Sequence, residues 1–192
     1  MSTTPTLGGG AFGSFATLRL VGPAVVADAS GGQIQVNANT KFATNVPLDR
    51  FMLITKILYF LTWTKLPALG ANANVGDWTI ASQMTEALAR TLFTASDGLF
   101  VDEWTLSIKE AQLTTSGSAN PVILPGAIDR VLYNPWATQA QNLNSIVSVQ
   151  PNNVNVNGPN VSVASVLEFQ LLPITTDIRT YLATRVQIAG QA

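Results

Sequence analysis

One apolar stretch, residues 51–63, constrains the fold more than any other part of the chain. It reads FMLITKILYFLTW, and its β-branched and aromatic residues favour a strand over a helix. Both alternating sets of side chains are largely apolar, so we expect both faces to be buried and Leu58→Asp to prevent folding. With only thirteen residues and Lys56 near its middle, the stretch is too short to cross a bilayer. It therefore predicts a central strand around which shorter strands pack.

Shorter segments on both sides have the alternating pattern of half-buried strands. They are separated by glycine, proline and asparagine turns. The clearest of them lie at residues 15–21, 33–38, 77–83, 100–110, 146–150 and 161–171, with two more around 121–124 and 128–133 that are interrupted by Pro125-Gly126. Because a helix does not follow each strand, an all-β fold is expected, an antiparallel β-sandwich of about eight strands.

Two segments have helical rather than strand spacing. Residues 85–93 place two leucines four apart behind Thr85, which can cap a helix, so a short inserted helix is expected there. Near the C-terminus, Thr175-Thr176-Asp177 precedes apolar side chains at helical spacing and predicts a closing helix.

The chemistry available to the chain is narrow because it contains neither histidine nor cysteine. This excludes disulfides, thiolate metal sites and catalytic triads or dyads that need either residue. The adjacent carboxylates Asp102 and Glu103 would point to opposite faces of a strand, which makes them a poor acid/base pair. We therefore expect no enzyme, no cofactor and no small-molecule substrate. A calcium ion or a sugar held by the loops stays open.

The charge pattern favours contacts with other protein chains. Charged residues are 11% of the chain, against about 25% in an average domain, and the net charge is -1. Residues 1–14 form an uncharged, glycine-rich segment that predicts a flexible N-terminal arm, in which Phe12 and the following Phe15 are candidate contacts with other subunits or partners. Because this arm and the rest of the chain lack a basic cluster, direct nucleic-acid binding is not expected. Residues 15–192 are predicted to form one domain.

Trp136 stands out among the aromatic residues. It lies in NPWATQAQNLN, residues 134–144, which predicts a long polar loop, whereas most other aromatic residues occupy inward strand positions. Two interpretations are open for Trp136: it contacts a ligand or partner, or it covers the edge of the core.

The layout of residues 51–83, the VDEWTL segment at 101–106 and the closing VLEFQLLPITTDIRTYLATR at 166–185 together resemble a single jelly-roll capsid protein. The resemblance is narrower still to the small major capsid proteins of tailless icosahedral double-stranded DNA viruses, including bacteriophages, with an internal membrane. It implies a jelly-roll fold and a subunit that assembles with copies of itself, with other capsid proteins and with an internal membrane. It also implies location in the virion after synthesis in the host cytoplasm. On this basis, removal of residues 1–14 is expected to spare the fold and impair assembly.

A β-sandwich binding module is the alternative interpretation. Examples are a phage receptor-binding protein, a decoration protein and a carbohydrate-binding domain. The asparagine-rich segments 67–76 and 134–144, the latter with Trp136, are the features that favour sugar contacts.

Overall fold

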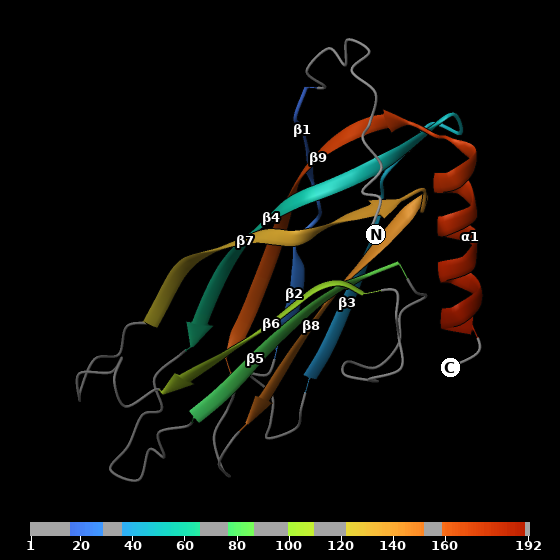
Figure 1. Cartoon of the computed structure of the whole chain (residues 1–192). Helices are drawn as coiled ribbons and strands as arrows, with labels where there is room; N and C mark the ends of the chain where they lie inside the picture. Colours follow the sequence, from blue (N-terminus) through green and yellow to red (C-terminus); the bar gives the residue numbers. More distant parts are fainter. Residues whose placement is uncertain are drawn as a thin grey trace, which may run out of the picture.

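Nine strands in two antiparallel sheets and one C-terminal helix make up the part of the chain that the computed structural model describes, residues 16–28, 36–65, 77–86, 100–109, 122–151 and 159–190 (Figure 1). Sheet 1 contains β1 (Leu18–Val21), β2 (Val25–Asp28), β4 (Arg50–Lys65), β7 (Val122–Thr138) and β9 (Asn160–Pro173). Sheet 2 contains β3 (Val36–Ala43), β5 (Asp77–Thr85), β6 (Phe100–Lys109) and β8 (Asn142–Pro151). Helix α1 spans Thr176–Gly190.

The order of the strands is that of a jelly roll. Strands β1 and β2 both pair with β9 and share one edge position, so sheet 1 has the order β1/β2–β9–β4–β7 and sheet 2 the order β3–β8–β5–β6. The pairs β1/β2 with β9, β3 with β8, β4 with β7 and β5 with β6 join the first half of the chain to the second half in reverse order. This is the arrangement of two interlocked Greek keys. The predicted all-β jelly-roll sandwich is confirmed, and its nine strands fill eight positions.

Gly22 explains why the first edge position is divided between two strands. Its backbone N–H donates to the Ser165 carbonyl oxygen at 2.8 Å, and a Cβ at this position would lie 2.9 Å from Ser165 Oγ. A larger residue at this position would require the Ser165 hydroxyl to move. The sequence pattern did not predict β2, which begins three residues later.

The central strand is confirmed as β4, but the prediction that both of its faces are buried is wrong. A register shift lies between Ile54 and Lys56, so Thr55 forms a β-bulge that reverses the alternation. Ile54 faces the core before the bulge and Ile57 faces it afterwards, while Phe60, on the opposite face, is 49% exposed. The strand therefore has one core face and one outer face, as in any two-layer sandwich.

Strand β7 corrects two sequence-based predictions. The chain continues as strand through Pro125-Gly126 and through residues 134–138, so Trp136 lies on β7, paired with Ile54, and not in a loop. Only residues 139–141 connect β7 to β8. The reason is the position of β7 at the edge of sheet 1. An edge strand has a hydrogen-bonded neighbour on one side only, so the N–H that proline lacks can be one that would have pointed away from the sheet.

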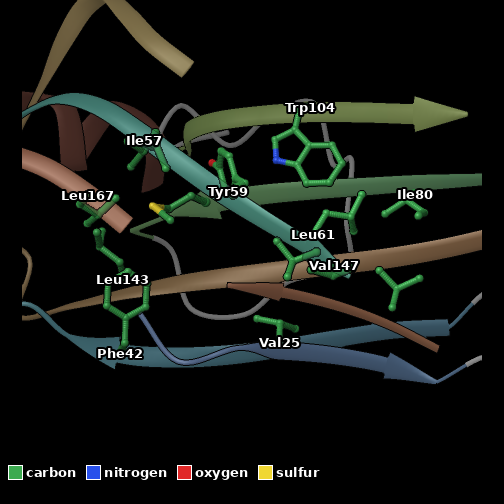
Figure 2. Close-up of a cluster of buried hydrophobic side chains, with 14 of the residues drawn as sticks. Val25, Phe42, Ile57, Tyr59, Leu61, Ile80, Trp104, Leu143, Val147 and Leu167 are labelled. Atoms are coloured by element: carbon green, nitrogen blue, oxygen red, sulfur yellow. The ribbon is translucent and has the colours of Figure 1, made fainter. Parts of the chain in front are cut away.

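The core lies between the two sheets (Figure 2). Tyr59 of β4 points towards Trp104 of β6, and their rings meet edge to face with centroids 5.6 Å apart. The fully buried side chains include Trp63 and Trp78, as expected for aromatic residues at inward strand positions. The same picture shows Val25 of β2 among these side chains, so the unpredicted strand contributes to the core.

Helix α1 stands at the end of the sandwich where β9 finishes (Figure 1). The predicted closing helix is confirmed, and Thr175 Oγ1 caps it by accepting the Ile178 N–H at 3.3 Å. The predicted start of the inserted helix at Thr85 is wrong, because Thr85 is the last residue of β5 and pairs with Phe100 and Asn144. The rest of that prediction, residues 87–93, lies outside the described residues.

Candidate functional site

Four charged residues cross the outer face of sheet 1, the face turned away from sheet 2. Arg19 on β1, Glu168 on β9 and Lys56 on β4 stand in one ladder line, and Asp129 on β7 stands in the next line, opposite Leu58; we call these four residues the charge row. Arg19 Nη2 lies 2.6 Å from Glu168 Oε1, and Lys56 Nζ lies 2.8 Å from Asp129 Oδ2. The hydrogen bond that Lys56 donates to Asp129 raises the pKa of Lys56, and desolvation acts in the opposite direction. The signs alternate across the whole width of the sheet.

Beside the charge row lies a group of apolar side chains that we call the outer band: Val21, Leu58, Phe60, Ala164 and Val166. Ladder pairing places Val21, Val166 and Leu58 in one line across β1, β9 and β4. Phe60 stands in the next line, between two alanines, Ala164 on β9 and Ala127 on β7. Val21 is 70% exposed.

The outer face of sheet 2 has a different character. Most of its exposed side chains on the two edge strands are polar: Asn37, Asn39 and Lys41 on β3, and Glu103, Thr105 and Ser107 on β6. An outward apolar band is therefore specific to sheet 1 within the described residues. Surface apolar groups that gather in this way mark contacts with other molecules more often than scattered ones do.

A buried polar network closes one side of the sandwich beneath this face. Asp102 on β6 is 7% exposed and lies 3.1 Å from Arg130 Nη2 of β7, while the Tyr59 hydroxyl donates to Asp102 Oδ2 at 3.2 Å. Burial, together with the charge of Asp102, raises the pKa of Tyr59 well above its ordinary value. The hydrogen bond to Asp102 also raises the pKa of Arg130. Both shifts keep the proton on Tyr59 and on Arg130, which suits a structural link between the sheets and not proton transfer at neutral pH.

A second network ties α1 to both sheets. Arg185 Nη2 lies 2.9 Å from Glu86 Oε1 at the end of β5, and Arg185 Nη1 donates to the Ala137 carbonyl oxygen on β7 at 2.8 Å. The Trp136 Nε1–H donates to the same Glu86 oxygen at 2.5 Å. The Arg185 guanidinium lies over the Trp136 ring, 4.1 Å from its centroid.

The structure brings together different residues from those that the sequence singled out. Trp136 is half-buried, packs against the core and is covered by Arg185, and its predicted partner contact stays a prediction. Phe12 and Phe15 lie outside the described residues. Asp102 and Glu103 do point to opposite faces, and Asp102 is a buried ion-pair partner of Arg130.

Sequence reasoning missed the outer band because it assigned the apolar side chains of residues 51–63 to two buried faces. The outer band can be recognised only from the pairing of the strands. The outward residues of β1, β4 and β9 are seen to be neighbours once the Thr55 bulge and the ladder registers are known. A linear pattern does not contain that information.

Two further classes of site can be examined in the described part of the chain. No group of three or more acidic side chains there is placed to hold a metal ion. Among those same residues, no helix has the length and apolar character needed to span a membrane.

No protein-family model matches the chain, and no curated protein matches it. Among solved structures, a chain of the empty head of turnip yellow mosaic virus is 14% identical, with 92% of this chain and 90% of that chain covered and a TM-score of 0.32. A chain of desmodium yellow mottle tymovirus is 11% identical, with 92% and 93% covered and a TM-score of 0.34. TmCBM61 in complex with β-1,4-galactotriose is also 11% identical, with 79% and 70% covered and a TM-score of 0.29.

At such TM-scores, none of the three supports a functional argument. The jelly-roll assignment rests on the strand order itself. The narrower resemblance to capsid proteins of tailless double-stranded DNA viruses stays a prediction from the sequence.

Proposed function

We propose that this chain is a structural subunit of a viral capsid that assembles with copies of itself. The observation that carries the proposal is the outer band, an apolar strip on the outer face of a jelly-roll sandwich, in which Val21 and Phe60 are exposed and the other side chains are half-buried. A shell is stabilised when identical subunits bury such a strip at each of their contacts, and this role requires no catalytic site.

Composition supports the same role. A net charge of -1 and a charged fraction of 11% give little electrostatic repulsion between copies. The two polar networks at Asp102 and Arg185 join strands and helix to one another, so these charged groups form their ion pairs inside the subunit and not with a neighbour. In this proposal the chain has no catalytic activity, lies in the virion and is made in the host cytoplasm.

Contacts with other capsid proteins and with an internal membrane complete the proposal. A membrane between the shell and the genome would relieve the shell of binding nucleic acid, which agrees with the absence of a basic cluster in the sequence. The virus would then be of the tailless double-stranded DNA type that the sequence resembles.

Assembly of the purified full chain tests the proposal directly. Sedimentation velocity over a wide range of concentration, followed by negative-stain electron microscopy, should show reversible oligomers and then closed particles or flat sheets. A chain that remains monomeric at every concentration, with and without added salt, would contradict the proposed function.

The binding-module alternative makes a different prediction for the same sample. Saturable quenching of tryptophan fluorescence by a sugar, lost on Trp136→Ala, would favour it. The Trp136 ring is half-buried under Arg185 in the described structure, so a sugar would first have to displace that guanidinium. A glycan array gives the wider survey.

A further inference from the structure

We infer that the outer face of sheet 1 binds the same face of a second copy of this chain, across a two-fold axis that runs parallel to the strands. This inference rests on the proposed function and specifies one contact of the assembly. It is drawn from the charge row and the outer band, which lie side by side on β1, β9, β4 and β7.

The two central residues of the charge row are complementary when the strand order is reversed. One ladder line reads positive, negative, positive for Arg19, Glu168 and Lys56, and Asp129 follows on β7 one line away. A two-fold axis parallel to the strands reverses this order in the second copy while keeping its position along the strands. Glu168 then faces Lys56 of the second copy, while Asp129 of the second copy lies one ladder line away from the position that faces Arg19. The two central charges each meet the opposite charge, once from each copy, which is what an isologous interface requires of its polar groups.

The other in-plane axis gives the opposite result. A two-fold axis perpendicular to the strands and passing through the charge row would place Glu168 against Glu168 and Lys56 against Lys56. Like charges placed face to face oppose association. The charge row therefore selects one orientation of the second copy.

The central part of the outer band, on β9 and β4, is complementary under the same axis. The axis passes between β9 and β4, the two central strands of sheet 1, so each residue of one strand faces its ladder partner from the other copy. Phe60 then lies over Ala164 of the second copy, and Leu58 lies over its Val166. A large side chain meets a small one twice, once from each copy. Sheets that stack face to face interdigitate their side chains in this manner, about 10 Å apart.

Two single charge reversals test the inference by mutual rescue. In a dimer of Lys56→Glu chains, residue 56 faces Glu168 in both contacts. In a dimer of Glu168→Lys chains, residue 168 faces Lys56 in both contacts. Each variant alone should have its dimer dissociation constant raised by about tenfold, measured by sedimentation equilibrium on the full chain. In an equimolar mixture, both contacts of the mixed dimer are again between opposite charges, so association should return to near the wild-type value.

Controls separate this contact from folding and from other contacts. Thermal melting shows that each variant is folded, and Lys41→Glu, on the outer face of sheet 2, is the matched reversal. Phe60→Ser changes a half-exposed side chain and should weaken association without lowering the melting temperature greatly. Weak association of each reversal with no rescue on mixing would overturn the inference, and so would association unchanged by either reversal. If particles still form in those cases, the proposed function stands; a monomeric wild-type chain would remove both.

Discussion

Because of Tyr59, the unfolding free energy of the chain is expected to fall at alkaline pH. Burial and the neighbouring Asp102 raise its pKa in the folded chain, so the folded state keeps the phenol proton to higher pH than the unfolded state does. The contribution of Tyr59 to stability is therefore complete below its unfolded pKa and decreases as pH rises above about 10. Urea denaturation at increasing pH should show a steeper alkaline loss of unfolding free energy in the wild type than in Tyr59→Phe.

The control for this prediction is Tyr133→Phe, which removes a phenol from a fully exposed side chain. It should leave the wild-type alkaline slope as it is. Equal slopes for the wild type and Tyr59→Phe would show that the buried hydroxyl does not titrate with unfolding, and the prediction would be wrong.

Strand β4 offers a test of the register in two neighbouring residues. Ile57 is fully buried and faces the core, whereas Leu58 faces outward and is half-buried. Ile57→Asp should prevent folding, because an unpaired charge in the core costs more than about 4 kcal/mol. Leu58→Asp should fold with a loss of about 1–2 kcal/mol and impaired association. Circular dichroism and thermal melting of the two variants compare them directly; an unfolded Leu58→Asp chain would restore the expectation of two buried faces.

The attachment of α1 depends on one buried ion pair. The Glu86 and Arg185 side chains are 8% and 12% exposed. Arg185→Leu leaves the Glu86 carboxylate buried without its cation and should cost about 3 kcal/mol of unfolding free energy. The double variant Glu86→Leu/Arg185→Leu should cost less than the sum of the two single changes, which a double-mutant cycle by urea denaturation would measure. Arg179→Leu, at an exposed position on the same helix, is the control and should change stability little.

The elements that the sequence predicts well are those with a strong local pattern. The apolar run of β4, the alternation of β9 and the capped α1 all follow from residues close in the chain. The elements that it predicts poorly depend on where a segment lies in the sheet. Pro125 and Pro135 suggest a loop until β7 is known to be an edge strand. The Thr55 bulge, and with it the outward direction of Phe60, becomes visible only against the registers of β7 and β9.

The described part of the molecule joins a packed core to one outer face on which apolar side chains gather. Its polar networks link sheet 1 to sheet 2 through Asp102 and link α1 to both sheets through Arg185. The described part of the chain is thus held together at its side and at its end, while Val21 and Phe60 of the outer band are exposed. Exposed apolar surface of this kind raises the free energy of an isolated chain in water, and burying it against another molecule lowers that free energy again.

The segment 1–14 gives the last prediction, which follows from its sequence alone. It contains no charged side chain and a run of three glycines, and residues 15–192 contain every strand described. A chain that begins at residue 15 should therefore melt at nearly the wild-type temperature, because it keeps the whole core. Its particles, counted by electron microscopy at equal protein concentration, should be fewer or misshapen, since the arm's contacts with neighbouring subunits are lost. A matched variant that keeps the arm but carries Phe12→Ser tests whether that side chain is the contact. Normal particles from the shortened chain would mean that the jelly roll assembles through its sheets without the arm.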